Sequence, residues 1–288
     1  MQVVFHLGAH ATDGGLLIRS ILRNRARLAS EGIGVPGPAR YRELLGQTST
    51  RLRGDTADAE TEGLILDAIR DDVTAERIIL SSESFLCRAA MAIDTDGLYP
   101  KAEKSAWLAA CLPHHQASFA LGIRNPASFL PEMARTLSGD ASLPDEIILD
   151  SLLWSDVVAD ISAANPGAEI YVWCHEDTPF IWSEIIREVT GHDPFTELEG
   201  EFDMLETIMT EDGFERLQEF LASRGVSDQY KRRRAVAAFL EAHVIEEKVE
   251  EEIDLPGWTG ETIEMLTEIY EEDVGRIGGM PHVTLITP

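Results

Sequence analysis

Short apolar runs alternate with helical segments along the first two thirds of the chain. The runs are rich in β-branched and aromatic residues and predict four strands: Gln2–Leu7, Arg77–Ser82, Ala117–Ile123 and Glu169–Cys174. Helical periodicity predicts the segments between them: Leu16 to near Gly32, Leu64–Val73, Lys101–Cys111 and Pro144–Ala164. Strands that alternate with helices of this length form a parallel sheet covered on both faces. We therefore predict an α/β fold with three layers, αβα, around a mostly parallel sheet.

The pattern changes near residue 200. Four helical segments follow, and then one short strand: Asp203–Met209, Gly213–Ser223, Asp228–Lys248, Glu261–Arg276 and Val283–Ile286. The chain has no internal repeat, low-complexity tract or long linker. We expect a single domain over residues 1–288, with an α/β core at 1–200 and a mainly helical C-terminal extension at 201–288.

The charge of the chain restricts its partners. The sequence has 51 acidic and 24 basic residues, a formal net charge of −27, which repels nucleic acid and anionic lipid. No apolar run approaches the roughly 20 residues that span a bilayer. The first eight residues lack the basic region and the apolar core that are typical of a signal peptide. The three cysteines lack the spacing of metal ligands. We expect a cytoplasmic protein with no nucleic-acid, membrane or metal partner; the sequence gives no indication of oligomeric state.

The basic residues are concentrated at the N-terminus. Residues 1–53 hold eight arginines and three acidic residues, a net charge of +5 on an otherwise negative chain. This distribution predicts one local place that accepts an anion. A basic helix face exposed to water is the alternative interpretation.

A glycine-containing loop joins the first predicted strand to the first predicted helix. Gly8 to Gly15 bring several backbone N–H groups and a helix N-terminus together, an arrangement that suits phosphate or sulfate. The Gly-Lys-Ser/Thr of a Walker A loop is missing, and so is the G-x-G-x-x-G of dinucleotide-binding proteins.

Three motifs, in this order, resemble those of bacterial sulfotransferase-like proteins. His6-Leu-Gly-Ala-His10 is similar to the opening of their H-x-G-x-H-K-T-G-T-T loop, and Leu121-Gly-Ile-Arg-Asn-Pro126 is similar to their second motif. Leu255-Pro-Gly-Trp-Thr, followed by Tyr270 and Asp273, resembles their C-terminal helix. The resemblance implies a topology like that of P-loop NTPases and the sulfuryl donor PAPS as cosubstrate.

The resemblance also implies the site residues. The 5′-phosphosulfate of PAPS would lie on the loop, and Arg124 would hold the 3′-phosphate. The residues expected to bind PAPS are Gly8, Ala9, His10, Thr12, Gly14, Gly15, Arg19 and Arg124. Glu83, which follows the second strand, or His10 would take the proton of an acceptor hydroxyl on a small molecule or glycan.

The chain departs from the family pattern at five positions. Gly14 and Gly15 replace two threonines, and three further changes alter the charge of the site. Ala11 stands where the family has lysine, Asp13 replaces a glycine, and Glu132 replaces a serine eight residues after Arg124. All three changes disfavour a doubly charged donor. Two hypotheses remain open. Arg19 or Arg23 replaces the lost lysine and the chain transfers sulfuryl groups, or it is an inactive homologue that binds another ligand or a partner.

Other polar clusters have a structural interpretation. His6 lies within a strand and is expected to be a core residue. His175-Glu176-Asp177 precedes Thr-Pro and indicates a helix start rather than a metal site. Lys231–Arg234 is expected to pair with neighbouring carboxylates, with the binding of an acidic partner as the alternative.

Overall fold

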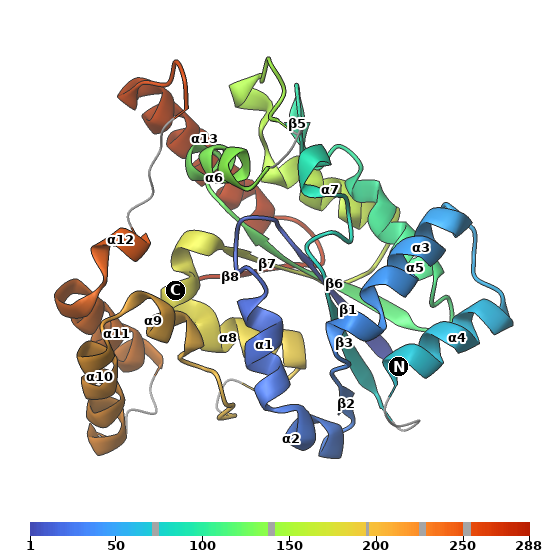
Figure 1. Cartoon of the computed structure of the whole chain (residues 1–288), viewed down its shortest axis with the longest axis horizontal. Coiled ribbons are helices and arrows are strands. Elements are labelled where there is room, and N and C mark those ends of the chain that lie inside the picture. Colours follow the sequence, from blue (N-terminus) through green and yellow to red (C-terminus); the bar gives the residue numbers. More distant parts are fainter. Residues whose placement is uncertain (71–74, 138–141, 194–195, 225–228, 250–254) are drawn as a thin grey trace.

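A six-stranded parallel sheet forms the centre of the molecule (Figure 1). The computed structural model describes residues 1–70, 75–137, 142–193, 196–224, 229–249 and 255–288. The strands of the sheet are β1 (Gln2–Gly8), β2 (Ile33–Gly34), β3 (Arg77–Ser81), β6 (Gln116–Ile123), β7 (Ile170–Cys174) and β8 (Val283–Ile286). Their order is β2-β3-β1-β6-β7-β8, and every neighbouring pair is parallel. This order, with the first long strand at the centre, confirms the predicted P-loop-like α/β fold.

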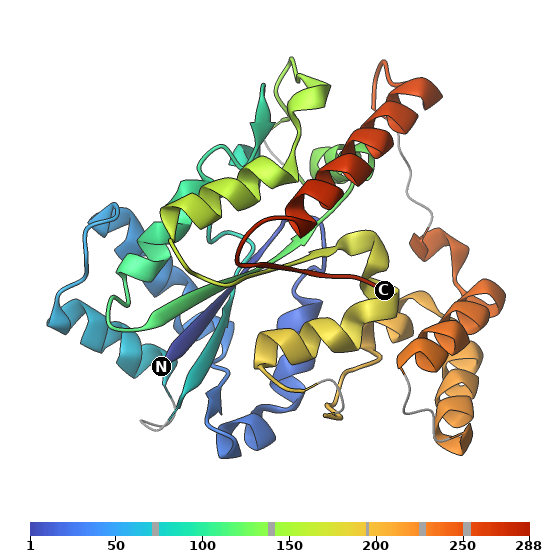
Figure 2. The ribbon, with the colours of Figure 1, turned by 180° about the vertical axis from the view of Figure 1, so that it is seen from behind.

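Helices cover both faces of the sheet (Figures 1 and 2). One face packs against α3 (Arg42–Leu52), α4 (Ala59–Ile69), α5 (Ser105–Ala110), α6 (Pro126–Thr136), α7 (Trp154–Ala164) and α13 (Gly260–Gly278). The other packs against α1 (Leu16–Arg23), α2 (Arg25–Ser30), α8 (Thr178–Thr190) and α9 (Asp203–Ile208). The side chains of β1 alternate between the two cores: Val3 and Phe5 belong to the first, and Val4 belongs to the second.

The C-terminal helices form a smaller core beside the sheet. The remaining helices of this part are α10 (Glu211–Arg224), α11 (Gln229–His243) and α12 (Glu246–Val249). Leu217 of α10 and Val236 of α11 are buried against Leu205 of α9. The chain then returns to the main core, where α13 packs against α7 and β8 pairs with β7. No helix in the described part of the chain is long and apolar enough to cross a membrane.

Short elements connect the main ones. They are a hairpin of β4 (Ile93–Asp94) and β5 (Gly97–Leu98) and the 3₁₀ turns η1 (Pro38–Arg40), η2 (Ala89–Met91), η3 (Ala102–Lys104), η4 (Leu149–Ser151) and η5 (His175–Asp177).

Several predicted helix boundaries were wrong. The first helix breaks at Asn24, whose side chain accepts a hydrogen bond from the Glu199 backbone nitrogen and donates to the Glu199 carbonyl. The helix predicted from Pro144 begins only at Trp154. The helix predicted from Leu64 begins at Ala59, because Asp58 accepts a hydrogen bond from the Thr61 nitrogen at 2.8 Å. Its predicted last residue, Val73, lies outside the described residues.

Candidate functional site

The loops that follow four neighbouring strands lie at one edge of the sheet (Figure 1). Because the strands are parallel, their carboxyl ends lie at the same edge, where open α/β sheets collect ligands. The glycine loop follows β1, Glu83 follows β3, Arg124 follows β6 and His175 follows β7. The residues expected from the sequence are therefore neighbours at this edge.

Gly8 allows the first loop to pass directly beside Glu83. Its φ of +100° lies in the region that favours glycine, and a Cβ atom at this position would be 3.1 Å from the Cα atom of Glu83. The Ala9 nitrogen donates to the Gly122 carbonyl at 3.0 Å, which holds the loop against β6. The predicted loop residue and the predicted base are thus brought together.

The carboxylate of Asp13 lies at the start of α1. Its Oδ2 atom accepts a hydrogen bond from the Leu17 nitrogen at 2.8 Å, and its carbonyl accepts from the Leu16 nitrogen at 2.9 Å. The Thr12 hydroxyl donates to the Ala9 carbonyl at 2.7 Å. The loop therefore satisfies the first N–H groups of α1 with its own acidic residue, and its threonine hydroxyl is used internally.

Two arginines contact the loop. Arg19 reaches back from α1, and its Nη1 atom donates to the Gly14 carbonyl at 3.0 Å. Arg124 is buried, and its Nη1 atom donates to the Ala11 carbonyl at 2.5 Å while its Nε atom donates to Ser128 at 3.1 Å. The loop and Arg124 are direct neighbours, as the resemblance requires.

Glu132 does not contact Arg124 in the described structure. It lies on α6 and forms an ion pair with Arg135 at 2.7 Å. Ser128 contacts the Arg124 guanidinium instead, four residues after it rather than eight.

His10 is buried, and its backbone and its ring both contact Tyr99. The Tyr99 hydroxyl accepts a hydrogen bond from the His10 backbone nitrogen at 2.8 Å and lies 2.8 Å from the His10 Nδ1 atom. The Tyr99 hydroxyl can accept a second hydrogen bond from Nδ1–H or donate its own proton to an unprotonated Nδ1, depending on the tautomer of His10. Burial lowers the pKa of His10 to about 4, so the ring is neutral at pH 7. The role of base for His10 stays a prediction.

His6 has the structural role predicted for it. It is buried, its Nδ1 atom lies 2.9 Å from the Ser81 hydroxyl, and its ring stacks on Trp173 at a centroid distance of 5.7 Å. Burial lowers the pKa of His6, which favours the neutral ring.

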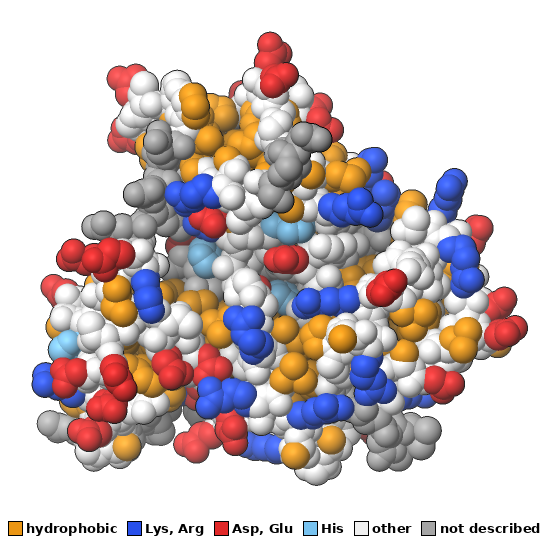
Figure 3. Space-filling view, in the orientation of Figure 1, with side chains coloured by type: hydrophobic (Ala, Val, Ile, Leu, Met, Phe, Trp, Pro, Cys, Tyr) orange, Lys and Arg blue, Asp and Glu red, His pale blue; other side chains and the backbone are white. Residues whose placement is uncertain are grey.

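A large cavity opens beside Glu83. Its volume is about 1640 Å³, and it lies between α3, the segment from Ser82 to Leu108, and residues 142–145. Its lining includes six basic side chains: Arg42, Arg51, Arg53, Arg88, Lys101 and Lys104. Figure 3 shows this face of the molecule, with basic side chains around its central hollow. Glu83 is exposed, and its carboxylate makes no hydrogen bond or ion pair with any residue in the described ranges.

The segment after β7 is structural. His175–Asp177 forms η5, which leads into α8 with proline at its start, as predicted. The Glu176 carboxylate accepts from the Asn125 nitrogen at 2.7 Å and from the Tyr270 hydroxyl at 3.0 Å, and burial raises the pKa of Tyr270. The residues that the structure describes contain no group of three or more side chains suited to a metal ion.

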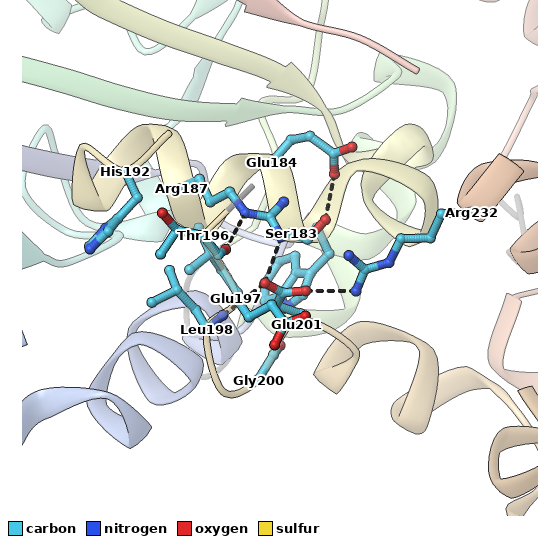
Figure 4. Close-up of polar contacts among 12 residues, drawn as sticks. Ser183, Glu184, Arg187, His192, Thr196, Glu197, Leu198, Gly200, Glu201 and Arg232 are labelled. Carbon is cyan, nitrogen blue, oxygen red and sulfur yellow. Dashed lines mark hydrogen bonds and ion pairs between the residues drawn. The ribbon is translucent and has the colours of Figure 1, made fainter. Parts of the chain in front are cut away.

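Two arginines of the basic cluster on α11 pair with carboxylates, as predicted, and Figure 4 shows one of them, Arg232. Arg232 lies 2.6 Å from Glu201, which also pairs with the buried Arg187 at 2.6 Å. Arg233 lies 3.1 Å from Glu184. These arginines stabilise the contact between the C-terminal helices and α8.

Sequence reasoning missed three residues of this region. Tyr99 and Arg42 come from connecting segments without a recognisable motif; the Arg42 Nε atom donates to the Ser81 carbonyl at 2.8 Å. Ser128 could have been found, because it lies one helical turn after Arg124.

Comparisons with known proteins gave one similarity that we report. No protein-family model matches the chain, and no curated protein matches it. Among solved structures, the chain is similar to a sulfotransferase from Alicyclobacillus acidocaldarius, with 15% sequence identity and a TM-score of 0.40. The similarity covers 82% of this chain and 97% of that chain.

Proposed function

We propose that this chain is a sulfotransferase-like protein that binds a ligand at the carboxyl edge of its sheet and does not transfer sulfuryl groups from PAPS. The hydrogen bond from the Leu17 nitrogen to the Asp13 carboxylate carries this proposal. A phosphosulfate at the start of α1 would need the same N–H group. It would also lie beside a carboxylate, and two like charges about 4 Å apart repel by roughly 1–4 kcal/mol.

The surroundings of the loop support the same conclusion. Ala11 supplies no cation, and Arg19 and Arg124 each donate to a loop carbonyl. Sulfuryl transfer, like phosphoryl transfer, depends on donors aimed at the charged oxygens of the transferred group. In this loop, part of that donor capacity is used within the chain itself.

Sulfuryl transfer from PAPS remains the second candidate function. Glu83 supports it, because this exposed carboxylate lies beside Gly8 and would take the proton of an acceptor hydroxyl on a small molecule or glycan. In its Nε2–H tautomer, His10 would then serve as a donor to the transferred group.

Calorimetry with PAP, the desulfated product of PAPS, tests the proposal. We expect no binding at millimolar PAP, and we expect the double variant Ala11→Lys/Asp13→Gly to gain binding. Glu215→Gln/Glu219→Gln changes the net charge by the same amount on the exposed surface of α10 and should gain none. Binding of PAP by the unaltered chain at micromolar concentration would overturn the proposal and favour the transferase.

A further inference from the structure

Six basic side chains line the cavity beside Glu83. None of Arg42, Arg51, Arg53, Arg88, Lys101 and Lys104 forms an ion pair with a residue in the described part of the chain. Four carboxylates share the lining, Glu43, Glu83, Asp94 and Asp145, but none of them lies within 4.0 Å of a basic nitrogen of this group.

Several arginines outside the cavity pair with carboxylates: Arg23 with Asp203 at 2.6 Å, and Arg187 with Glu201 at 2.6 Å. In a chain with 51 acidic and 24 basic residues, carboxylates are abundant. Six basic groups against four carboxylates leave the described lining of this cavity with an excess of positive charge, which favours an anionic ligand.

The basic groups extend along the cavity. Arg42 begins α3 and Arg53 directly follows it, so 11 residues separate them, about 16 Å along a helix axis. Lys104 belongs to the opposite wall and lies over the ring of Trp107, 4.7 Å from its centroid. A single phosphate or sulfate would meet only part of this surface.

We propose that the cavity binds an extended ligand that carries several anionic groups, with its charges on the arginines of α3 and on the basic residues of the opposite wall. The inference deepens the proposed binding function and rests on it. The net charge of −27 opposes unspecific binding of polyanions, so an affinity for such a ligand must come from a local site. Glu83 would lie at the end of the ligand nearest the glycine loop.

Calorimetry with small probes tests the proposal and distinguishes two sources of the anionic groups. The probes are a sulfated tetrasaccharide, linear tripolyphosphate, a neutral tetrasaccharide and inorganic sulfate. We expect the sulfated sugar, the oligophosphate or both to bind, with an affinity that falls as salt rises, and the neutral sugar and inorganic sulfate not to bind. Absence of binding by both polyanions at millimolar concentration, or equal binding of the neutral sugar, would overturn the proposal.

Paired variants locate the site. Arg51→Ala/Lys101→Ala removes two exposed cavity cations and should weaken polyanion binding at least tenfold. Arg216→Ala/Arg234→Ala removes two cations from α10 and α11 and should change the affinity less than twofold. Equal losses in the two double variants would contradict the assignment. PAP binding is measured on the same samples. Absence of polyanion binding would contradict the cavity proposal alone, whereas binding of PAP would contradict the proposed function.

Discussion

The hydroxyl of Tyr99 lies 2.8 Å from both the backbone nitrogen and the Nδ1 atom of His10. One side chain, about 90 positions further along the chain, therefore contacts both the backbone of the loop and the ring of its histidine. The His10 Nε2 atom is buried and has no hydrogen-bond partner among the described residues.

Because His10 is neutral when buried, we expect the folded chain to lose stability at acidic pH. Burial lowers the pKa of His10 from 6.5 to about 4, so between these values the unfolded chain binds a proton that the folded chain does not. The contribution of the neutral His10 ring to the free energy of unfolding is present above pH 6.5 and is lost as the pH falls toward 4. We expect His10→Gln to reduce the slope of unfolding free energy against pH in this window by up to about 1.4 kcal/mol per pH unit.

Urea unfolding at several pH values from 4 to 7.5 measures this slope. The buried His6 also has a lowered pKa, so some pH dependence should remain in the His10 variant. His282→Asn, at an exposed histidine, serves as the control. An unchanged slope in His10→Gln would show that His10 titrates as it does in the unfolded chain.

Asp13 can be tested for its role as an internal anion. Asp13→Gly removes the acceptor of the Leu17 N–H group and should cost about 1 kcal/mol of unfolding free energy, as the loss of a helix cap does. Asp13→Asn keeps an oxygen acceptor and should cost less. Only the glycine variant frees the start of α1, so added sulfate should raise its melting temperature more than that of the unaltered chain. An equal response of both proteins to sulfate would show that the carboxylate does not exclude an anion.

Gly8 should be the glycine least tolerant of alanine in this loop. A Cβ atom there would be 3.1 Å from the Glu83 backbone, at a φ of +100° that L residues rarely adopt. We expect Gly8→Ala to lower the unfolding free energy by about 1–3 kcal/mol. Gly63 lies within α4 with open space around it, so Gly63→Ala should raise it by about 0.5–1 kcal/mol. Thermal unfolding of both variants gives the comparison.

The sequence predicted the sheet well because periodicity is a local signal. The run Gln2–Leu7 has apolar residues on both faces, as a central parallel strand requires, and β1 is flanked on both sides. Helix ends were less predictable. Asn24 breaks the first helix because of a contact with Glu199, 175 positions away, and no local pattern reports such a partner.

The candidate site was predictable only in part. Arg124 and the loop follow from the motif order, since both come after strands of one parallel sheet. The tautomer of His10 depends on Tyr99, and the positive cavity depends on how α3 faces the segment around Lys101. These are tertiary contacts between segments without a shared motif, and a count of charges along the chain does not show which arginines lack partners.

The buried ion pairs at Glu201 predict a large loss of stability when the charge is removed (Figure 4). Glu201 accepts from Arg187 and Arg232 at 2.6 Å each, and the side chains of Arg187 and Glu201 are 5% and 6% exposed. Glu201→Gln leaves the Arg187 guanidinium buried without a counter-charge, so we expect a loss of about 3–5 kcal/mol of unfolding free energy. Arg232→Ala should cost less, because Arg232 is 23% exposed and Arg187 keeps its partner.

Glu197→Gln removes a nearby carboxylate that is exposed, and it should change the unfolding free energy by less than about 0.5 kcal/mol. Chemical denaturation of Glu201→Gln, Arg232→Ala and Glu197→Gln measures how far the loss of unfolding free energy depends on burial of the removed charge. A similar small loss for Glu201→Gln and Glu197→Gln would mean that water reaches Arg187 and that the pair contributes no more than a surface contact. A loss confined to Glu201→Gln would instead show that the buried charge of Glu201 contributes the stability.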